Sequence, residues 1–301
     1  MDNRNEVREF LISRRAKLSP ERAGLKVGTA QRRVAGLRRA EVAMLADVSV
    51  EYYAKLERGN VAGASDSVLS SIARALQLDD AERAHLFDLA RAANDAGAKP
   101  RRGTSKSASI RPGLQRALDA ITAGPAFVRN GRMDILAVNP LGKAFYADVF
   151  ASPGLGNLAR FCFLDPERAR LFYPAWDAAA DVTVAILRTE AGRDPHNKDL
   201  QDLIGELSTR SDEFRTRWGA HNVRRHGTGE KTFHHALVGD LTLTYEGLEL
   251  TTDPDWSFLI YTAEPGSPSE ERLRLLASWA ASREQESAPA APVADPDRST
   301  S

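Results

Sequence analysis

The sequence predicts two domains of different class: an all-α N-terminal domain of five short helices and a C-terminal α+β domain. A chain of 301 residues corresponds to about two domains. Apolar residues follow a helical period through residues 5–96, whereas helical and strand periods alternate through residues 111–283. Residues 97–110 are basic and small with no apolar period, which predicts a flexible linker. The Ala- and Pro-rich residues 284–301 predict a disordered tail.

The helices of the N-terminal domain are predicted from apolar faces and end signals. In chain order they are marked by Val7, Phe10, Leu11 and Leu18, by residues 38–46, by residues 50–58, by Leu69, Ile72, Ala73 and Leu76, and by Leu86, Phe87, Leu89 and Ala90. Ser49 stands at the N-cap of the third helix and Gly59 just past its end. Asp79 followed by Glu82 is a capping box for the fifth helix.

The C-terminal domain alternates between helical and strand patterns. Leu114, Leu118 and Ile121 predict a first helix, and two long helices are expected at 174–190 and 199–218. Polar residues followed by proline predict further helix starts at Asn139-Pro140, Asp165-Pro166 and Ser267-Pro268. Strands are expected at residues 126–128, 135–138, 231–235, 241–250 and 258–264. Helices segregated from a mostly antiparallel sheet make an α+β domain.

Composition and charge narrow the class of protein. The longest stretch without a charged residue has eleven residues, too few for a membrane span of roughly 18–20. The N-terminus has no apolar segment behind a basic start, and the single cysteine, Cys162, cannot form an internal disulfide. We therefore expect a cytoplasmic protein with no membrane partner. Residues 1–118 carry a net charge of +8 and residues 119–301 carry −8, so the basic end is expected to meet a polyanion.

Two expected helices joined by Asp47-Val48-Ser49 have the spacing of a helix-turn-helix unit. Val42-Ala43, Val48-Ser49, Tyr53 and the residues 56–59 resemble the Xre/Cro-like helix-turn-helix pattern. Asp47 and Tyr53 depart from that pattern, which usually has glycine and an aliphatic residue there; aspartate tolerates the turn geometry better than most residues. The resemblance implies that Tyr53 is buried. It implies that the DNA-facing positions are Ser49, Val50, Glu51, Tyr52 and Lys55.

A longer string, residues 32–46 with 48–53, resembles the MmyB-like branch of Xre-type transcription regulators, with Ala35 replacing the usual proline. Its arginines stand at the start of the helix that crosses the phosphate backbone, where they can contact phosphates. These arginines are Arg32, Arg33, Arg38 and Arg39. The alternative reading of such a cluster is a solvated charged surface.

The resemblance continues through the C-terminal domain and so covers nearly the whole chain. It rests on residues 135–141, 157–161, 211–215, 238–241 and 245–246, and on Trp176, Arg188, Trp218 and His221. Ala236 replaces a proline of the family. The MmyB-like ligand-binding domain is PAS-like, which implies a small lipophilic ligand, with a fatty acid reported for the family.

Candidate ligand-binding residues are aromatic and polar side chains in apolar neighbourhoods. They are Asn157, Arg160, Phe161, Trp176, Arg188, Phe214, Trp218 and His221. Aromatic side chains at helical spacing are also typical of plain core. A buried arginine needs a partner, which is either a ligand carboxylate or an Asp or Glu of the protein, and the sequence leaves both open. Arg188 and Arg160 are the leading candidates for a ligand head group.

No pattern of a catalytic or metal site is present. His234 and His235 are adjacent on an expected strand and point to opposite faces, so they cannot easily share an ion. We predict no enzyme, no metal and no cofactor other than a possible bound fatty acid. The predicted function is a DNA-binding regulator of transcription, a homodimer on duplex DNA, modulated by a lipophilic ligand. The alternative is a regulator whose C-terminal domain is a ligand-free dimerisation or protein-interaction module.

Overall fold

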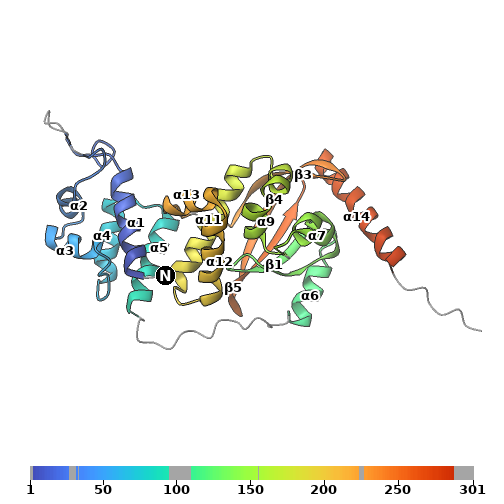
Figure 1. The fold of residues 1–301 in the computed structure, drawn as a ribbon, viewed down its shortest axis with the longest axis horizontal. Helices are drawn as coiled ribbons and strands as arrows, with labels where there is room; N and C mark the ends of the chain where they lie inside the picture. Colours follow the sequence, from blue (N-terminus) through green and yellow to red (C-terminus); the bar gives the residue numbers. More distant parts are fainter. Residues whose placement is uncertain are drawn as a thin grey trace, which may run out of the picture.

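The computed structural model of the chain describes residues 3–26, 32, 34–94, 110–154, 156–223 and 227–287. A helical N-terminal domain lies at one end of an elongated molecule and a mixed domain at the other (Figure 1). Of the predicted linker, only Ile110 lies within the described residues. Helix α14 (Pro268–Ser287) continues past the expected start of the tail at residue 284, and the rest of the predicted tail lies outside the described part.

Five helices form the described N-terminal domain at the five predicted positions. They are α1 (Asn3–Lys17), α2 (Arg39–Leu45), α3 (Val50–Glu57), α4 (Asp66–Ala75) and α5 (Asp80–Asn94). Their apolar faces meet in one core. Tyr53 is fully buried in this core, as the resemblance implied, and Leu18 is buried just beyond the end of α1.

The end signals of these helices form as predicted. Ser49 Oγ accepts the Tyr52 amide at 3.1 Å and caps α3. Asp79 and Glu82 exchange the two bonds of a capping box at 2.8 and 3.1 Å. Asp47 in the turn between α2 and α3 has φ +54°, a left-handed conformation that aspartate tolerates. Local polar chemistry therefore fixes the geometry of the α2–turn–α3 unit.

Gly59, just after α3, is expected to be hard to replace. It has φ +86°, and a Cβ there would lie 2.2 Å from the Arg4 carbonyl oxygen of α1. Gly63 has φ +76° but open space around its Cβ position, so a substitution there measures the cost of the backbone conformation without a steric clash. We expect Gly63→Ala to cost about 1 kcal/mol of unfolding free energy and Gly59→Ala clearly more than 2 kcal/mol. Equal losses in urea titrations of the two variants would contradict the close approach of α1.

A five-stranded antiparallel sheet forms the centre of the C-terminal domain, in the order β2-β1-β5-β4-β3. The strands are β1 (Ala126–Asn130), β2 (Ile135–Val138), β3 (Thr228–His235), β4 (Gly239–Leu250) and β5 (Asp253–Thr262). All five predicted strands are present, each at or near its expected position. On β3, His234 is exposed and His235 buried, so the adjacent histidines do point to opposite faces.

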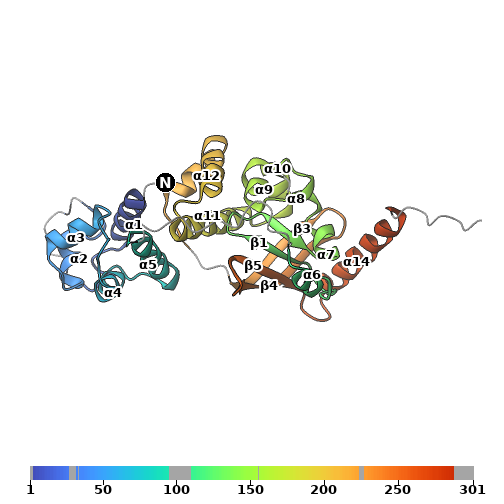
Figure 2. The ribbon, with the colours of Figure 1, turned by 90° about the horizontal axis from the view of Figure 1, so that it is seen from below.

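The two faces of the sheet carry cores of different size. Phe127 of β1 and Tyr261 of β5 point into the larger core, whereas Val128 and Phe258 point into a smaller one. Alternation along each strand produces this division. Helix α6 (Pro112–Asp119) covers the smaller core through Leu118. The remaining helices supply the other side of the larger core or its edge (Figure 2).

The helices on the larger core are one long helix near its predicted position, α11, and several shorter ones. They are α7 (Pro140–Phe145), α8 (Ala147–Ala151), α9 (Leu158–Leu164), α10 (Pro166–Phe172), α11 (Trp176–Arg193), α12 (Lys198–Arg210) and α13 (Asp212–Gly219). The prediction of a single helix at 199–218 is wrong, because the segment divides into two helices at Ser211. Ser211 Oγ accepts the Phe214 amide at 3.2 Å and so caps the start of α13. None of the described helices is long and apolar enough to span a membrane.

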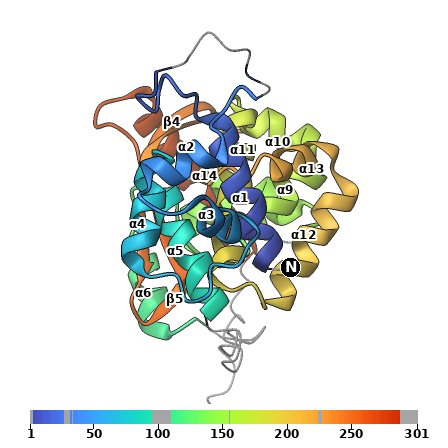
Figure 3. The ribbon, with the colours of Figure 1, turned by 90° about the vertical axis from the view of Figure 1, so that its left-hand side faces the viewer.

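The two domains meet where α1 and α5 pack against the C-terminal half of α11 and the end of α13 (Figure 2). Helices α2 and α3 lie at the opposite end of the N-terminal domain, nearest the viewer in Figure 3. The contact therefore leaves the α2–α3 unit uncovered by the C-terminal domain.

Candidate functional site

The exposed face of α3 brings together the side chains that the sequence predicted. Tyr53 and Leu56 point inward, which turns Val50, Glu51 and Lys55 outward and leaves Tyr52 half-buried. Val50 is 41% exposed, so its apolar side chain is available for a contact. A helix with this mixture of apolar, acidic, aromatic and basic groups can contact base edges and thymine methyl groups in a major groove.

Beside this face, a buried carboxylate holds two arginines. Glu57 is 1% exposed and accepts Arg15 Nε at 2.5 Å on one oxygen and Arg39 Nε on the other. The hydrogen bond that Arg39 donates to Glu57 is the main cause that raises the pKa of Arg39. Arg39 still exposes about half of its side chain, so it stays within reach of a phosphate. Sequence reasoning did not identify this role of Glu57.

Arg32 and Arg38 flank the start of α2. Arg32 binds Glu41 through two parallel hydrogen bonds of 2.7 and 2.8 Å, and Glu41 Oε2 also accepts the Arg38 amide. The hydrogen bond from Arg32, outweighing burial, lowers the pKa of Glu41 to about 2. The Arg38 side chain is exposed, whereas Arg33 lies outside the described residues. Arg38 and Arg39 thus stand together at the N-terminal end of α2.

A second feature lies between the sheet and the helices of the C-terminal domain. It is a small cavity with about 30 Å³ of free space, bounded by β1, β3, β5, α9 and α11. Most of its lining is apolar or aromatic: Phe127, Met133, Tyr146, Leu158, Cys162, Tyr173, Ala179, Val182, Ile186, Leu259 and Tyr261. Thr183, Arg129 and Lys231 supply polar groups.

Arg129 and Lys231 place two cations on this cavity. Arg129 is 6% exposed, and its Nη1 donates to the Asn130 carbonyl at 3.2 Å. Burial lowers its pKa. Lys231 lies over the Tyr245 ring, and burial together with repulsion from Arg129 lowers its pKa to about 8. Two like charges that repel each other inside an apolar site favour an anion between them.

The predicted ligand residues fall into four places, none of them the cavity. Phe161, Trp176 and Phe214 make edge-on ring contacts in the core, and Trp218 stacks on Phe214 with ring centroids 5.5 Å apart. Arg160 binds Glu206 at 2.8 Å. Asn157 caps α9 and joins the polar cluster described next. Arg188 and His221 lie together at the domain contact.

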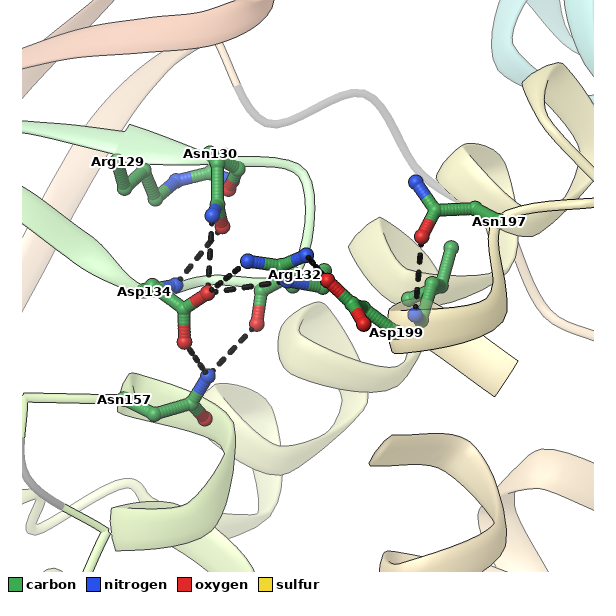
Figure 4. Close-up of polar contacts among 8 residues, drawn as sticks. Arg129, Asn130, Arg132, Asp134, Asn157, Asn197 and Asp199 are labelled. Atoms are coloured by element: carbon green, nitrogen blue, oxygen red, sulfur yellow. Dashed lines mark hydrogen bonds and ion pairs between the residues drawn. The ribbon is translucent and has the colours of Figure 1, made fainter. Parts of the chain in front are cut away.

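Asn157 belongs to a polar cluster that ties α9 to the sheet (Figure 4). Its amide donates to Asp134 at 2.7 Å, and Asp134 also accepts Asn130 and Arg132. Arg132 continues the chain of contacts to Asp199 on α12 at 2.8 Å. Burial raises the pKa of Asp134, but these hydrogen bonds together outweigh it. The cluster fixes the start of α9, which is a structural role.

Arg188 is fully buried, yet its partner is a residue of the N-terminal domain. Its guanidinium binds Glu6 of α1, His221 Nδ1 at 2.9 Å and the Trp218 carbonyl, and stacks over the Trp218 ring. Burial alone raises the pKa of Glu6, but His221 and Arg188 together lower it to about 2. Of the two partners left open by the sequence, the structure supplies a protein carboxylate.

Two protein-family models match the chain. Residues 110–276 match the MmyB-like transcription regulator ligand binding domain. The chain belongs to this MmyB-like family. Residues 14–86 match a helix-turn-helix domain, which spans the α2–α3 unit described above. No significant match is found among curated proteins. The MmyB-like chain is therefore a DNA-binding transcription regulator with a domain for a small-molecule ligand, and the cavity lies within that domain.

Proposed function

We propose that the protein is a sequence-specific transcription regulator whose DNA binding is modulated by a small lipophilic anion, with a fatty acid as the leading candidate. The observation that supports a lipophilic anion as the ligand is the cavity, which is mostly apolar and is lined by Arg129 and Lys231. The five-stranded antiparallel sheet with helices on its larger core supports a PAS-like assignment of the C-terminal domain. We also propose that the regulator is cytoplasmic, as the sequence predicts.

A carboxylate head group fits the cations of the cavity. The acidic group that most raises the pKa of Arg129 is Glu190, but Glu190 forms its ion pair with Arg193, at 3.1 Å. None of the ion pairs between described residues involves Arg129. A ligand carboxylate can accept two hydrogen bonds from the guanidinium, and each buried CH₂ of its chain adds about 0.8 kcal/mol.

The DNA-binding half of the proposal rests on α3 and the arginines of α2. Ser49, Val50, Glu51, Tyr52 and Lys55 would contact bases or their backbone, while Arg38 and Arg39 bind phosphates. A two-fold homodimer would place two such helices about 34 Å apart, one turn of the duplex.

Replacing Arg129 with methionine tests the ligand class. We expect Arg129→Met to weaken myristate binding by about tenfold or more, because one charged hydrogen-bonded contact is lost. Myristyl alcohol, which has the same chain and no charge, should bind about as before. Lys231→Met should act in the same direction, and Lys143→Met, at an exposed site on α7, serves as its control. Binding is measured by calorimetry on the full chain.

Two results would count against the ligand. If both probes weakened equally in Arg129→Met, the arginine would only support the fold. If the full chain bound neither myristate nor the alcohol saturably, the lipophilic-ligand proposal would fail. The alternative of a ligand-free interaction module would then replace it.

Replacing Arg38 and Arg39 together with alanine tests the DNA interface. We expect the double variant to bind all duplexes more weakly and to show a slope of log affinity against log salt reduced by about two. Tyr52→Ala and Lys55→Ala should mainly relax the sequence preference. Arg91→Ala, an exposed arginine on α5, is the matched control. An unchanged salt slope in the double variant would contradict the proposed docking.

A further inference from the structure

Helix α11 has two faces with different neighbours. Ala179, Val182, Thr183 and Ile186 recur at helical spacing and line the cavity, more residues than any other element contributes. Arg188, two residues beyond Ile186, lies about 200° further around the helix and binds Glu6 of the N-terminal domain. One rigid helix therefore contacts both the cavity and the N-terminal domain. Figure 2 shows α11 running from the N-terminal domain to the sheet.

The contact between α11 and the N-terminal domain is built from buried groups. Arg188 is 0% exposed and Glu6 6% exposed. Near the end of α11, a Cβ at Gly192 would lie 2.6 Å from the His85 ring of α5. Arg193 Nε lies 3.7 Å from the Asp88 carboxylate, and Asp88 is also on α5. A contact this close fixes the N-terminal domain to the position of α11.

A second set of contacts joins α1 to the segment after α13. The Arg14 guanidinium donates to the His221 carbonyl, and His221 Nδ1 lies 3.5 Å from Glu6. Lys17 Nζ donates to Asn222 Oδ1 at 2.6 Å. Because His221 also contacts Arg188, these groups form one interdomain cluster: Glu6, Arg14, Lys17, Arg188, His221 and Asn222. A shift of α11 has to disturb this cluster.

The cavity is too small for the ligand that its chemistry favours. Its free space of about 30 Å³ is the share of one water molecule, whereas ligand pockets span about 300–1,000 Å³. The strands that form one wall are held by backbone hydrogen bonds. The start of α9 is held by Asn157, Asp134 and Arg132 (Figure 4). The wall that can move is therefore α11, which contributes its small and aliphatic side chains.

We propose that α11 couples the cavity to the N-terminal domain. A lipophilic anion that enlarges the cavity displaces α11 and opens the interdomain cluster, so that occupancy changes how α3 is oriented relative to the C-terminal domain. This inference rests on the proposed function, because it requires a ligand in the cavity. A ligand shifts such an equilibrium only by its difference in affinity for the closed and opened arrangements. By linkage, weakening the cluster must strengthen ligand binding.

The test weakens the cluster and measures myristate binding to the full chain. Glu6→Gln keeps the shape of the side chain and removes its charge, and we expect myristate to bind about tenfold more tightly. Glu9→Gln is the matched control, because Glu9 lies on the same helix and, among the described residues, forms an ion pair only with Arg8 at an exposed site. Gly192→Ala opens the same contact by a different route, against His85, while Gly205→Ala, with open space around it, controls for helix propensity.

Hydrogen exchange on the wild-type chain supplies an independent measurement. Myristate should speed exchange of the α1 amides, residues 3–17, and leave those of α4 unchanged. If myristate binds the wild type and the Glu6→Gln and Gly192→Ala variants with equal affinity, and α1 exchange does not respond, the coupling through α11 is overturned while the proposed function stands. If the wild type binds no myristate, the proposed function fails first.

Discussion

Arg188→Met is expected to lower the free energy of unfolding of the full chain by about 3–5 kcal/mol at pH 7. The change removes the charge that faces Glu6, and breaking a buried ion pair by deleting one partner costs about this much. The methionine retains most of the bulk of the side chain, so little of the loss comes from a cavity. The control is Arg210→Met. The Arg210 side chain is 59% exposed, so its ion pair with Glu206 contributes at most about 1 kcal/mol to the free energy of unfolding. Urea titration of both variants gives the comparison.

The same variant separates the two partners that the sequence left open for Arg188. Because its guanidinium binds Glu6 in the structure, Arg188→Met should shift the affinities for myristate and for myristyl alcohol alike. A selective loss of myristate binding, with the stability unchanged, would show that Arg188 meets the ligand head group after all.

The free energy of unfolding of the wild type is expected to decrease between pH 6.5 and pH 5, and His85→Leu is expected to remove most of that decrease. Burial lowers the pKa of His85 to about 3 in the folded chain, against about 6.5 in the unfolded chain. As the pH falls through this window, the unfolded chain takes up a proton that the folded chain does not. The free energy of unfolding therefore decreases, by about 2 kcal/mol at pH 5.

The surroundings of His85 explain why it stays neutral. The ring packs edge-on against Phe10, and neither ring nitrogen has a hydrogen-bond partner among the described residues. Glu6 favours the charged ring, whereas burial and repulsion from Arg188, Arg14 and His221 together keep its pKa low. Leucine satisfies the same apolar site, so His85→Leu should be no less stable at pH 7. His234→Gln, at an exposed site, is the control. A wild-type stability that is flat from pH 6.5 to pH 5 would refute this assignment.

The N-terminal domain could be predicted closely from the sequence, because its signals are local. Ser49, Gly59 and the pair Asp79–Glu82 act on backbone groups within a few residues of themselves. The same holds for Asn139, which caps α7 where the sequence predicted a helix start. The short helices α8 and α9 had no such periodic pattern to mark them. The break at Ser211 was hidden because the apolar period continues through it into α13.

The surroundings of the candidate ligand residues could not be predicted in the same way, because their partners are distant in sequence. Arg188 and Glu6 are 182 residues apart and belong to different domains. The burial of Arg129 could not be predicted either, because a charged residue at the end of an apolar strand usually marks the point where the strand leaves the core. Its one signal was an arginine continuing the strand Ala126–Val128. Lys231 was expected on a strand, but nothing in the sequence indicated that it lines the same cavity as Arg129.

The most direct test of ligand-modulated DNA binding is the affinity of the full chain for a duplex that it selects from random sequence, titrated with and without saturating myristate. We predict that myristate changes this affinity by about tenfold, and that the duplex changes the affinity for myristate by the same factor. Identical DNA affinities, with calorimetry showing the cavity occupied, would contradict the claim that the ligand modulates DNA binding.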